Sequence, residues 1–116
     1  MHGVSPGEAT VPVIGIVYVA HNRVTDKLYV GQTMDTLARR KGNHHHDARR
    51  GVGARFATAI RKDGIHSFDF FQVGSAHTKE ELNNLEKLWI IVLDTINTGY
   101  NAILGTIDIR DIKEHR

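Results

Sequence analysis

Residues 13–33 read VIGIVYVAHNRVTDKLYVGQT, and this stretch decides the fold of the chain around it. Two runs rich in β-branched and apolar residues, 13–20 and 27–32, flank a more polar connection. This pattern is typical of an antiparallel hairpin with a loop somewhat longer than the tightest turn. Centring the loop puts Tyr18 directly opposite Tyr29, so we predict two phenols side by side on one face of a sheet.

A glycine, Gly31, stands two positions after Tyr29. Backbone can approach a ligand closely at such a position because no Cβ is in the way. Two phenols beside it could line a binding site. The same pair is also typical of an ordinary cross-strand contact that packs a core, which two tyrosines alone favour over a binding site.

The chain has 116 residues with 41% apolar and 24% charged content, which predicts one domain with a single core. It has no cysteine, which excludes disulfides and thiolate metal sites. No apolar run approaches the ~20 residues that cross a bilayer, and residues 1–10 lack the features of a signal peptide. We therefore expect a flexible segment at 1–12, no membrane partner, and a cytoplasmic or nucleoid-associated protein.

Positive charge is concentrated in the middle of the chain. Residues 35–63 contain eight Lys or Arg against three Asp, a net charge of +5, whereas residues 1–34 are neutral and residues 64–116 carry −3. A basic segment of this kind can neutralise several phosphates, although a solvated helical face would have the same composition. The side chains that we expect to contact a nucleic-acid backbone are Arg39, Lys41, Arg49, Arg50 and Arg55.

The basic segment also predicts a helix that begins after Thr36 as its N-cap. Helical spacing places four residues near one face, namely Leu37, Arg40, His44 and Ala48. An arginine and a histidine one turn apart would then project into a shared cleft. Arg39 is the alternative to Arg40 if the preceding turn is one residue shorter. The consecutive histidines 44–46 point about 100° apart on a helix, so they cannot all bind one metal ion.

Two shorter elements follow. A helix is predicted at 54–62, with Phe56 and Ile60 facing the core, and Asp63-Gly64 ends it. Alternating apolar and polar residues predict a third strand at 67–73.

The most clearly written helix begins at Thr78, because Thr78 and Glu81 have the spacing of a capping box. Its predicted apolar stripe consists of Leu82, Leu85, Leu88, Trp89, Val92 and Leu93. Glu86 lies beside that stripe, where an unpaired carboxylate is costly. It is therefore either a partly exposed partner of a lysine or a functional group. The tripeptide 99–101, Gly-Tyr-Asn, predicts a turn that leads into a short closing strand.

Two triplets, Ile16-Val17-Tyr18 and Tyr29-Val30-Gly31, resemble the paired signature of the GIY-YIG nuclease family. Ile16 stands where the family usually has glycine, and Gly15 is one position early, through drift of the signature or a local bulge. Further matches follow in the family's order: Leu37 with Arg40 and His44, then Glu86 three positions before Trp89, then Gly99-Tyr100-Asn101. The resemblance covers residues 13–105 and leaves 106–116 as a C-terminal tail.

The resemblance implies an α/β domain with a small central antiparallel sheet of about three strands, flanked by helices. It also implies a metal-dependent endonuclease that hydrolyses DNA phosphodiester bonds with a single Mg²⁺ or Mn²⁺ ion. The implied catalytic residues are Tyr18, Tyr29, Arg40, His44, Glu86 and Asn101, with Glu86 as the metal ligand.

In such a site Arg40 would bind the scissile phosphate, Tyr29 would hydrogen-bond nearby, and Tyr18 would act as general base or orient water. A free phenol has a pKa near ~10, so His44 or the metal would have to lower the pKa of Tyr18. Two alternatives remain open. One is a catalytically silent nucleic-acid-binding module of the same fold. The other is the catalytic part of an assembly, in which a homodimer partner or a separate recognition protein selects the target.

Overall fold

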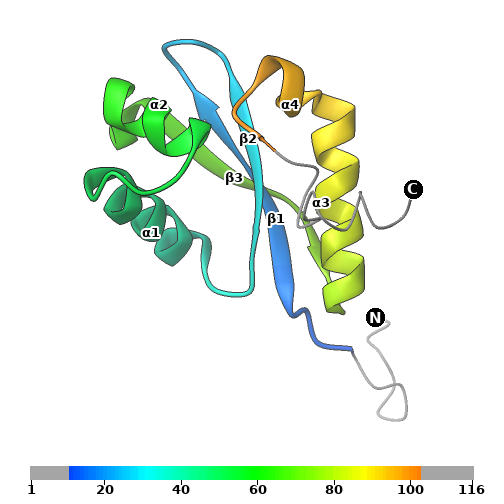
Figure 1. Ribbon diagram of the computed structural model, residues 1–116. Coiled ribbons are helices and arrows are strands. Elements are labelled where there is room, and N and C mark those ends of the chain that lie inside the picture. Colours follow the sequence, from blue (N-terminus) through cyan, green and yellow to red (C-terminus); the bar gives the residue numbers. More distant parts are fainter. Residues whose placement is uncertain (1–10, 103–116) are drawn as a thin grey trace, which may run out of the picture.

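The computed structural model describes residues 11–102. In chain order the elements are β1 (Gly15–Asn22), β2 (Leu28–Thr33), α1 (Leu37–Arg49), α2 (Arg55–Asp63), the 3₁₀ helix η1 (Ile65–Ser67), β3 (Phe68–Ala76), α3 (Lys79–Leu93) and α4 (Thr95–Thr98). The strands form one antiparallel sheet in the order β2-β1-β3, with α1 and α2 on one face and α3 on the other (Figure 1). The predicted fold class is confirmed. The predicted tail at 106–116 and most of the N-terminal segment, residues 1–10, lie outside the described residues.

The hairpin forms as predicted, but its register differs. Tyr18 lies opposite Gly31, and Tyr29 lies opposite Ala20, so the predicted pairing of Tyr18 with Tyr29 is wrong by two residues. An even shift keeps every side chain on its face of the sheet. The two phenols therefore still share a face, with ring centroids 6.3 Å apart.

Asn22 accounts for the shifted register. Its side chain is fully buried, and its amide donates to Asp63 Oδ2 at 2.8 Å and to the Tyr100 hydroxyl at 3.0 Å. Its Oδ1 accepts the backbone N–H of Val24 at 2.9 Å and so starts the turn. These contacts hold β1 in the sheet two residues beyond its predicted end, and the turn moves along the chain accordingly.

Gly15 begins β1 on the face that packs against α3. A Cβ built on Gly15 would meet Leu82 Cδ2 at 2.5 Å, so the helix lies directly over this position. β1 pairs with β2 without interruption, whereas its pairing with β3 skips Val73, the extra residue of a bulge in β3. The bulge therefore does not shift the first signature triplet, which leaves drift of the sequence as the explanation.

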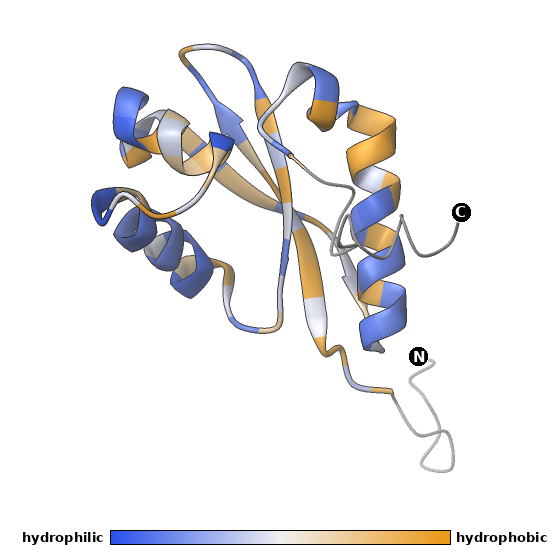
Figure 2. Cartoon of the chain, in the orientation of Figure 1, coloured by the Kyte–Doolittle hydropathy of each residue, from blue (hydrophilic) through white to orange (hydrophobic). Residues whose placement is uncertain are grey.

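Two apolar clusters cover the two faces of the sheet. On the α3 face, Val17, Val19 and Val30 pack with side chains of α3. On the other face, Ala20 packs with residues of α1 and α2, among them Phe56. Apolar colour follows the strands and the C-terminal half of α3, while α1 is largely polar (Figure 2). The predicted single core is thus a pair of layers with the sheet between them.

The remaining helices begin where the capping residues predict. Thr36 accepts the N–H of Arg39 and begins α1, and Thr78 accepts the N–H of Glu81 and begins α3. The Glu81 carboxylate accepts from His77 N, one residue before the expected partner. Helix α2 ends at Asp63, one residue beyond its predicted end, and β3 extends three residues beyond its predicted end. None of the helices within residues 11–102 is long and apolar enough to span a bilayer.

The buried face of α3 differs from the predicted stripe. Leu88 and Val92 are 54% and 63% exposed, whereas Ile90 and Glu86 are buried. The predicted apolar stripe is wider than the buried face. In the C-terminal half of α3, apolar residues continue around the helix to its solvent-exposed side. A glutamate, Glu86, instead lies in the interface with the sheet.

Candidate active site

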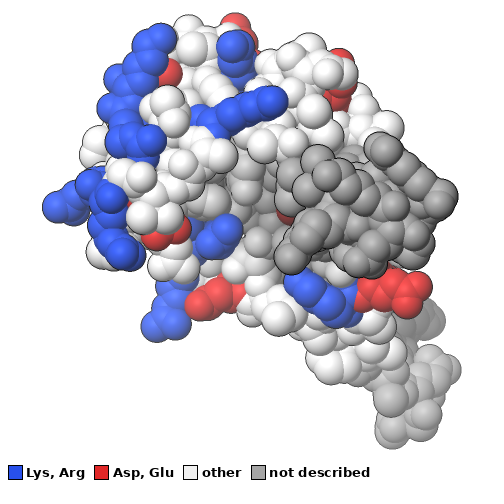
Figure 3. Space-filling model, in the orientation of Figure 1, with Lys and Arg blue, Asp and Glu red and all other residues white. Residues whose placement is uncertain are grey.

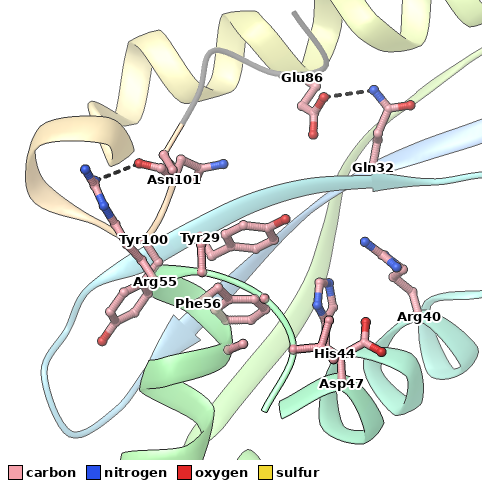
Figure 4. A pocket seen from close by; sticks show the side chains of 15 residues that line it. Tyr29, Gln32, Arg40, His44, Asp47, Arg55, Phe56, Glu86, Tyr100 and Asn101 are labelled. Atoms are coloured by element: carbon pink, nitrogen blue, oxygen red, sulfur yellow. Dashed lines mark hydrogen bonds between the residues drawn. The ribbon is translucent and has the colours of Figure 1, made fainter. Parts of the chain in front are cut away.

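A cavity of about 680 Å³ lies along β2, which is an edge strand of the sheet. Its wall combines side chains from both faces: Tyr29, Arg40 and His44 on the side of α1 and α2, and Gln32 and Glu86 on the side of α3 (Figure 4). The two faces meet here because no further strand extends the described sheet beyond β2. Residues far apart in sequence are thereby brought to one opening.

Tyr18 lies behind this wall and hydrogen-bonds to two of the residues that line the cavity. The Tyr18 hydroxyl is 2.6 Å from His44 Nε2, and Arg40 Nε donates to the same hydroxyl at 3.2 Å. A Cβ on Gly31 would lie 2.4 Å from the Tyr18 hydroxyl oxygen. The ring therefore rests on the Gly31 backbone, and any side chain there would displace it.

Burial dominates the protonation of this cluster. It raises the pKa of Tyr18, and the nearby Tyr29 adds to the effect while Arg40 opposes it. It lowers the pKa of His44 to about 3, with the Arg40 charge as the second cause. His44 is therefore neutral, and its Nε2 accepts the Tyr18 O–H. A neutral imidazole brings no charge to lower the pKa of Tyr18, so the expectation that His44 would do so is wrong for this state.

Tyr29 is fixed by stacking. Its ring lies parallel to that of Phe56, with centroids 4.0 Å apart and an interplanar angle of 2°. His44 contacts both rings edge-on. This aromatic packing orients the histidine and leaves it few alternative rotamers.

Glu86 enters the cavity from α3 and is only 6% exposed. Gln32 Nε2 donates to its Oε1 at 2.8 Å, and the other carboxylate oxygen points into the cavity (Figure 4). Burial raises the pKa of Glu86, while the hydrogen bond from Gln32 and the charges of Lys79, Arg40 and Lys87 oppose that shift. A buried carboxylate surrounded by cations and directed at an opening is a candidate cation ligand.

The donor set fits a hydrated Mg²⁺ ion better than a dehydrated metal. No cluster of three or more His, Cys, Asp or Glu residues occurs within residues 11–102, so a closed zinc-type site is not formed by this part of the chain. Mg²⁺ keeps several waters and commonly uses one or two carboxylates with substrate phosphates. Glu86, with one oxygen directed into the cavity, meets that requirement.

Asn101 closes the outer edge of β2. Its side chain accepts the N–H of Val30 at 2.8 Å and donates to the carbonyl of the same residue at 2.9 Å. The amide therefore replaces a neighbouring strand at the residue between Tyr29 and Gly31. Asn101 lines the cavity, and its observed contacts are those of a residue that holds the strand carrying the site.

The structure separates the two candidate arginines. Arg40 lies within the site, while the Arg39 side chain is 76% exposed and ion-pairs with Asp35 at 3.4 Å. Lys41 lies over the Phe70 ring, 5.4 Å from its centroid.

The other predicted DNA contacts lie at the end of α1 and the start of α2. Arg49 and Arg50 are exposed at the end of α1. Arg55 lines the cavity, and its Nη1 donates to the backbone carbonyls of Ile96 and Asn101, so it also ties α2 to α4 and the residues just after it. Lys and Arg side chains gather over α1 and α2 on the face that carries the opening (Figure 3).

Gln32 was not predicted as part of the site. One signal was available: it follows Leu28 and Val30 on the same face of β2 and is the only polar member of that row. Phe56 was predicted only as a core residue, and its stacking on Tyr29 depends on the placement of α2, which the apolar pattern does not specify.

Comparisons with known proteins agree with this architecture. The domain of intron endonuclease I-TevI, described as its catalytic domain, superimposes in a mutant form with a TM-score of 0.72 at 23% identity, over 81% of this chain and 98% of that one. A second structure of that domain, titled as from a homing endonuclease, gives a TM-score of 0.68 over 77% and 98% of the two chains. At this identity the likeness shows the fold.

Two curated relatives come from Invertebrate iridescent virus 6. They are the uncharacterized protein 019R, 29% identical over 87 residues, and the putative MSV199 domain-containing protein 146R, 28% identical over 99 residues. The matches cover 73% and 84% of this chain, but only 31% and 40% of those proteins. The chain thus spans well under half the length of these relatives.

The model of the GIY-YIG catalytic domain matches residues 14–101, which begin one residue before β1 and end at Asn101. Both signature triplets, the arginine and histidine of α1, and the α3 glutamate fall inside this range. Of these residues, Tyr29, Arg40, His44 and Glu86 line one cavity, and Tyr18 hydrogen-bonds to His44 and Arg40 behind its wall. The chain belongs to the GIY-YIG family.

Proposed function

We propose that the chain is a divalent-metal-dependent endonuclease that hydrolyses DNA phosphodiester bonds. One observation carries the proposal: Glu86 faces the cluster of Arg40, His44 and Tyr29 across a cavity with a basic surround. Family membership and the likeness to a domain titled as the catalytic domain of a homing endonuclease support it.

Arg40 binds the scissile phosphate in this proposal. Its guanidinium is a permanent planar cation suited to two phosphate oxygens. Its present bond to the Tyr18 hydroxyl is long for a hydrogen bond, at 3.2 Å. A phosphate oxygen is the stronger acceptor, so substrate draws the guanidinium towards the cavity and uncovers the phenol oxygen behind it.

Tyr18 and His44 then act together as the proton acceptor. The phenol oxygen accepts a proton from the attacking water while its own proton passes to His44 Nε2, 2.6 Å away. No phenolate accumulates, which suits the raised pKa of Tyr18. The negative charge of a bound phosphate favours the imidazolium that forms. Tyr29, on the cavity wall, hydrogen-bonds to the phosphate or the water.

Glu86 would hold the cation, Mg²⁺ or Mn²⁺, through the carboxylate oxygen that points into the cavity. Such an ion supplies Lewis acidity and neutralises charge that develops on the phosphoryl and leaving oxygens. Gln32 and Glu86 then lie on the side of the site that holds the metal, and Arg40 lies on the side that binds the phosphate.

Target choice belongs to other elements in this proposal. The matches span 31% and 40% of two viral relatives, so most of each of those proteins lies outside the matched segment. Recognition by a partner, either a second copy or a separate protein, is consistent with a basic surface that contacts the DNA backbone and carries no sequence information.

Incubation of the purified chain with supercoiled plasmid tests the activity, with Mg²⁺, with Mn²⁺ and with EDTA. We expect nicked or linear product with either metal and intact plasmid with EDTA. Plasmid that is bound but remains uncut under all three conditions would favour the silent binding module.

Glu86→Gln tests the metal ligand, because it keeps the shape and removes the charge. We expect a folded protein with unchanged DNA affinity and no metal-dependent cleavage. The matched control is Glu80→Gln in the exposed first turn of α3, which should cut plasmid normally. Cleavage by Glu86→Gln at the unmodified rate would remove Glu86 from the site, and loss of folding would make it a structural ion-pair partner.

A further inference from the structure

Gln32 connects the cavity carboxylate to a lysine outside the cavity. Its Nε2 donates to Glu86 Oε1 at 2.8 Å and to Asn83 Oδ1 at 2.9 Å, and its Oε1 accepts from Lys79 Nζ at 2.6 Å. Both amide hydrogens and the carbonyl oxygen of this side chain are therefore used. A fully bonded amide at the edge of a cavity has one defined orientation.

The chemistry of its neighbours fixes which way the Gln32 amide points. An ammonium group only donates, so the amide oxygen must face Lys79. An ionised carboxylate only accepts, so the amide nitrogen must face Glu86. The two neighbours require the same orientation, and the assignment does not rest on distinguishing oxygen from nitrogen in the amide.

The three partners of Gln32 form one stripe on α3. Lys79, Asn83 and Glu86 are spaced by four and then three residues, which places them on a single helical face. A single residue of β2, Gln32, thus holds two turns of α3 against the strand through hydrogen bonds. Gln32 is the polar member of an otherwise apolar row, and it stands where that row reaches Glu86.

We propose that Gln32 and Lys79 are positioning residues that hold Glu86 with its second oxygen directed at the cation of the active site. This inference rests on the proposed function. Lys79 orients the Gln32 amide, and Gln32 takes Oε1 of the carboxylate, so Oε2 remains for the metal. A glutamate side chain otherwise has several rotamers, and fixing one in advance removes an entropic cost from metal binding.

The variants Lys79→Met and Lys87→Met separate positioning from simple charge. Each removes one cation whose charge acts on Glu86, but only Lys79 bonds to Gln32. Gln32→Leu removes the amide itself, and Lys79→Arg keeps a cationic donor at the helix position. Lys79 is exposed, so its substitution leaves the packed core intact even if Gln32→Leu does not fold.

The first measurement is Mn²⁺ binding to the protein without DNA, followed by paramagnetic line broadening of backbone amide signals around Glu86. The second is the Mg²⁺ concentration that gives half-maximal plasmid cleavage. Loss of an outer partner of a metal ligand typically weakens metal affinity by about 10- to 100-fold. We expect about a tenfold loss for Gln32→Leu, a smaller loss for Lys79→Met, recovery in Lys79→Arg, and little change in Lys87→Met.

A third measurement reports on the brace itself. The side-chain amide signals of Gln32 should shift and exchange faster with water in Lys79→Met, but not in Lys87→Met. Equal effects of Lys79→Met and Lys87→Met on metal binding would reduce Lys79 to a source of charge and overturn the proposal. Unchanged metal affinity in both Gln32→Leu and Lys79→Met would overturn it as well.

The reference variants keep this test distinct from that of the proposed function. If the unmodified protein neither binds Mn²⁺ near Glu86 nor cuts plasmid, the endonuclease proposal fails and the positioning roles fail with it. If it does both, and Glu86→Gln abolishes both, the behaviour of the Gln32 and Lys79 variants decides the positioning roles alone.

Discussion

The phenol of Tyr18 has two hydrogen-bond partners with opposite demands: one needs an acceptor, and the other needs a donor. Arg40 donates to its oxygen, and His44 accepts its proton. A phenol meets both demands at once, because it carries one donor and can still accept. Phenylalanine would leave the Arg40 and His44 atoms without this partner in a buried setting, so the packing alone favours tyrosine at position 18.

Arg40 and Arg39 are expected to differ in what they lose on substitution. Arg40→Ala removes the cation beside Tyr18 and should slow cleavage by ~10²-fold or more, as loss of a transition-state charge partner does. Arg39→Ala should leave the rate at saturating DNA nearly unchanged, weaken binding, and reduce the salt dependence of binding by about one ion. Plasmid cleavage under saturating conditions and a salt titration of binding measure the two effects. Exchanged effects would shift the alignment after Gly31 by one residue.

His44 should make stability depend on pH. Burial lowers its pKa from 6.5 to about 3, so between these values the unfolded chain binds a proton that the folded chain excludes. The free energy of unfolding therefore falls as the pH falls through this window, by up to about 1.4 kcal/mol per pH unit from this residue.

His44→Phe should flatten that dependence in urea unfolding at pH 6.5, 5.5 and 4.5. His46→Phe, at an exposed position of the same helix, is the control. If the slope stayed the same in His44→Phe, the buried histidine would not be the source of the acid sensitivity.

Single positions were partly readable from the sequence. Arg40 and His44 were identified by their helical spacing together with the resemblance to the family, because one helical turn separates them wherever the helix packs. Gln32 and Phe56 were not, since their partners, Glu86 and Tyr29, lie on other elements. A contact between elements depends on how they pack, and no periodicity within one element encodes it.

The β1–β2 hairpin shows how far element-level prediction reached. Its strands, faces and approximate ends follow from the alternation of residues 13–33, whereas its register does not. The register depends on Asn22, whose partners Asp63 and Tyr100 lie 41 and 78 residues away. Side chains alternate along a strand with a period of two, so the local pattern predicts that the two tyrosines share a face of the sheet. It does not predict which residues of the two strands pair.

Helix α3 shows a second limit of prediction from sequence, which concerns the side chains that a helix buries. Thr78 predicted where this helix begins. The helix has more apolar residues than its interface with the sheet buries, however. Leu88 and Val92 were therefore predicted to be buried, but they are exposed. A charged residue, Glu86, is inside instead. Burial of a carboxylate runs against the hydrophobic pattern of the helix, and sequence patterns predict such placements least well.

Asn101→Ala should destabilise the edge of the sheet. Val30 is fully buried, and the substitution would leave both its N–H and its carbonyl without the Asn101 partner. Two unsatisfied buried groups cost about 2–4 kcal/mol together. Denaturant unfolding measures the loss, and Asn97→Ala, an exposed residue of α4, is the control with a cost of at most about 0.5 kcal/mol. A cost for Asn101→Ala no larger than that of the control would show that water replaces the amide at this edge.

Within the part of the chain that the structure describes, positive charge gathers over α1 and α2 (Figure 3). Residues 35–63, with a net charge of +5, form α1, α2 and the connection between them, and the cavity opens beside them. This arrangement places the positive potential where a DNA backbone must lie if a phosphate is to reach Arg40.

Reversal of Arg49 and Arg50 to glutamate should weaken binding to unrelated duplexes equally, because backbone contacts carry no sequence information. The slope of log affinity against log salt should decrease by about two. Arg49→Lys with Arg50→Lys keeps the charges and should bind nearly as before. If the reversed variant bound as tightly as the unmodified chain in low salt, the end of α1 would not contact DNA.

The side chain of Asn101 occupies the outer edge of β2 at Val30, and Tyr100 N donates to the carbonyl of Leu28 on the same edge. An edge strand with open backbone groups invites pairing with a strand of another molecule, and such pairing is a common route to aggregation. Here that route would also cover the cavity beside β2. The opposite edge, β3, has no further strand beside it within residues 11–102. Strand-to-strand association of two copies would therefore run through β3, and it would leave the opening beside β2 free on each copy.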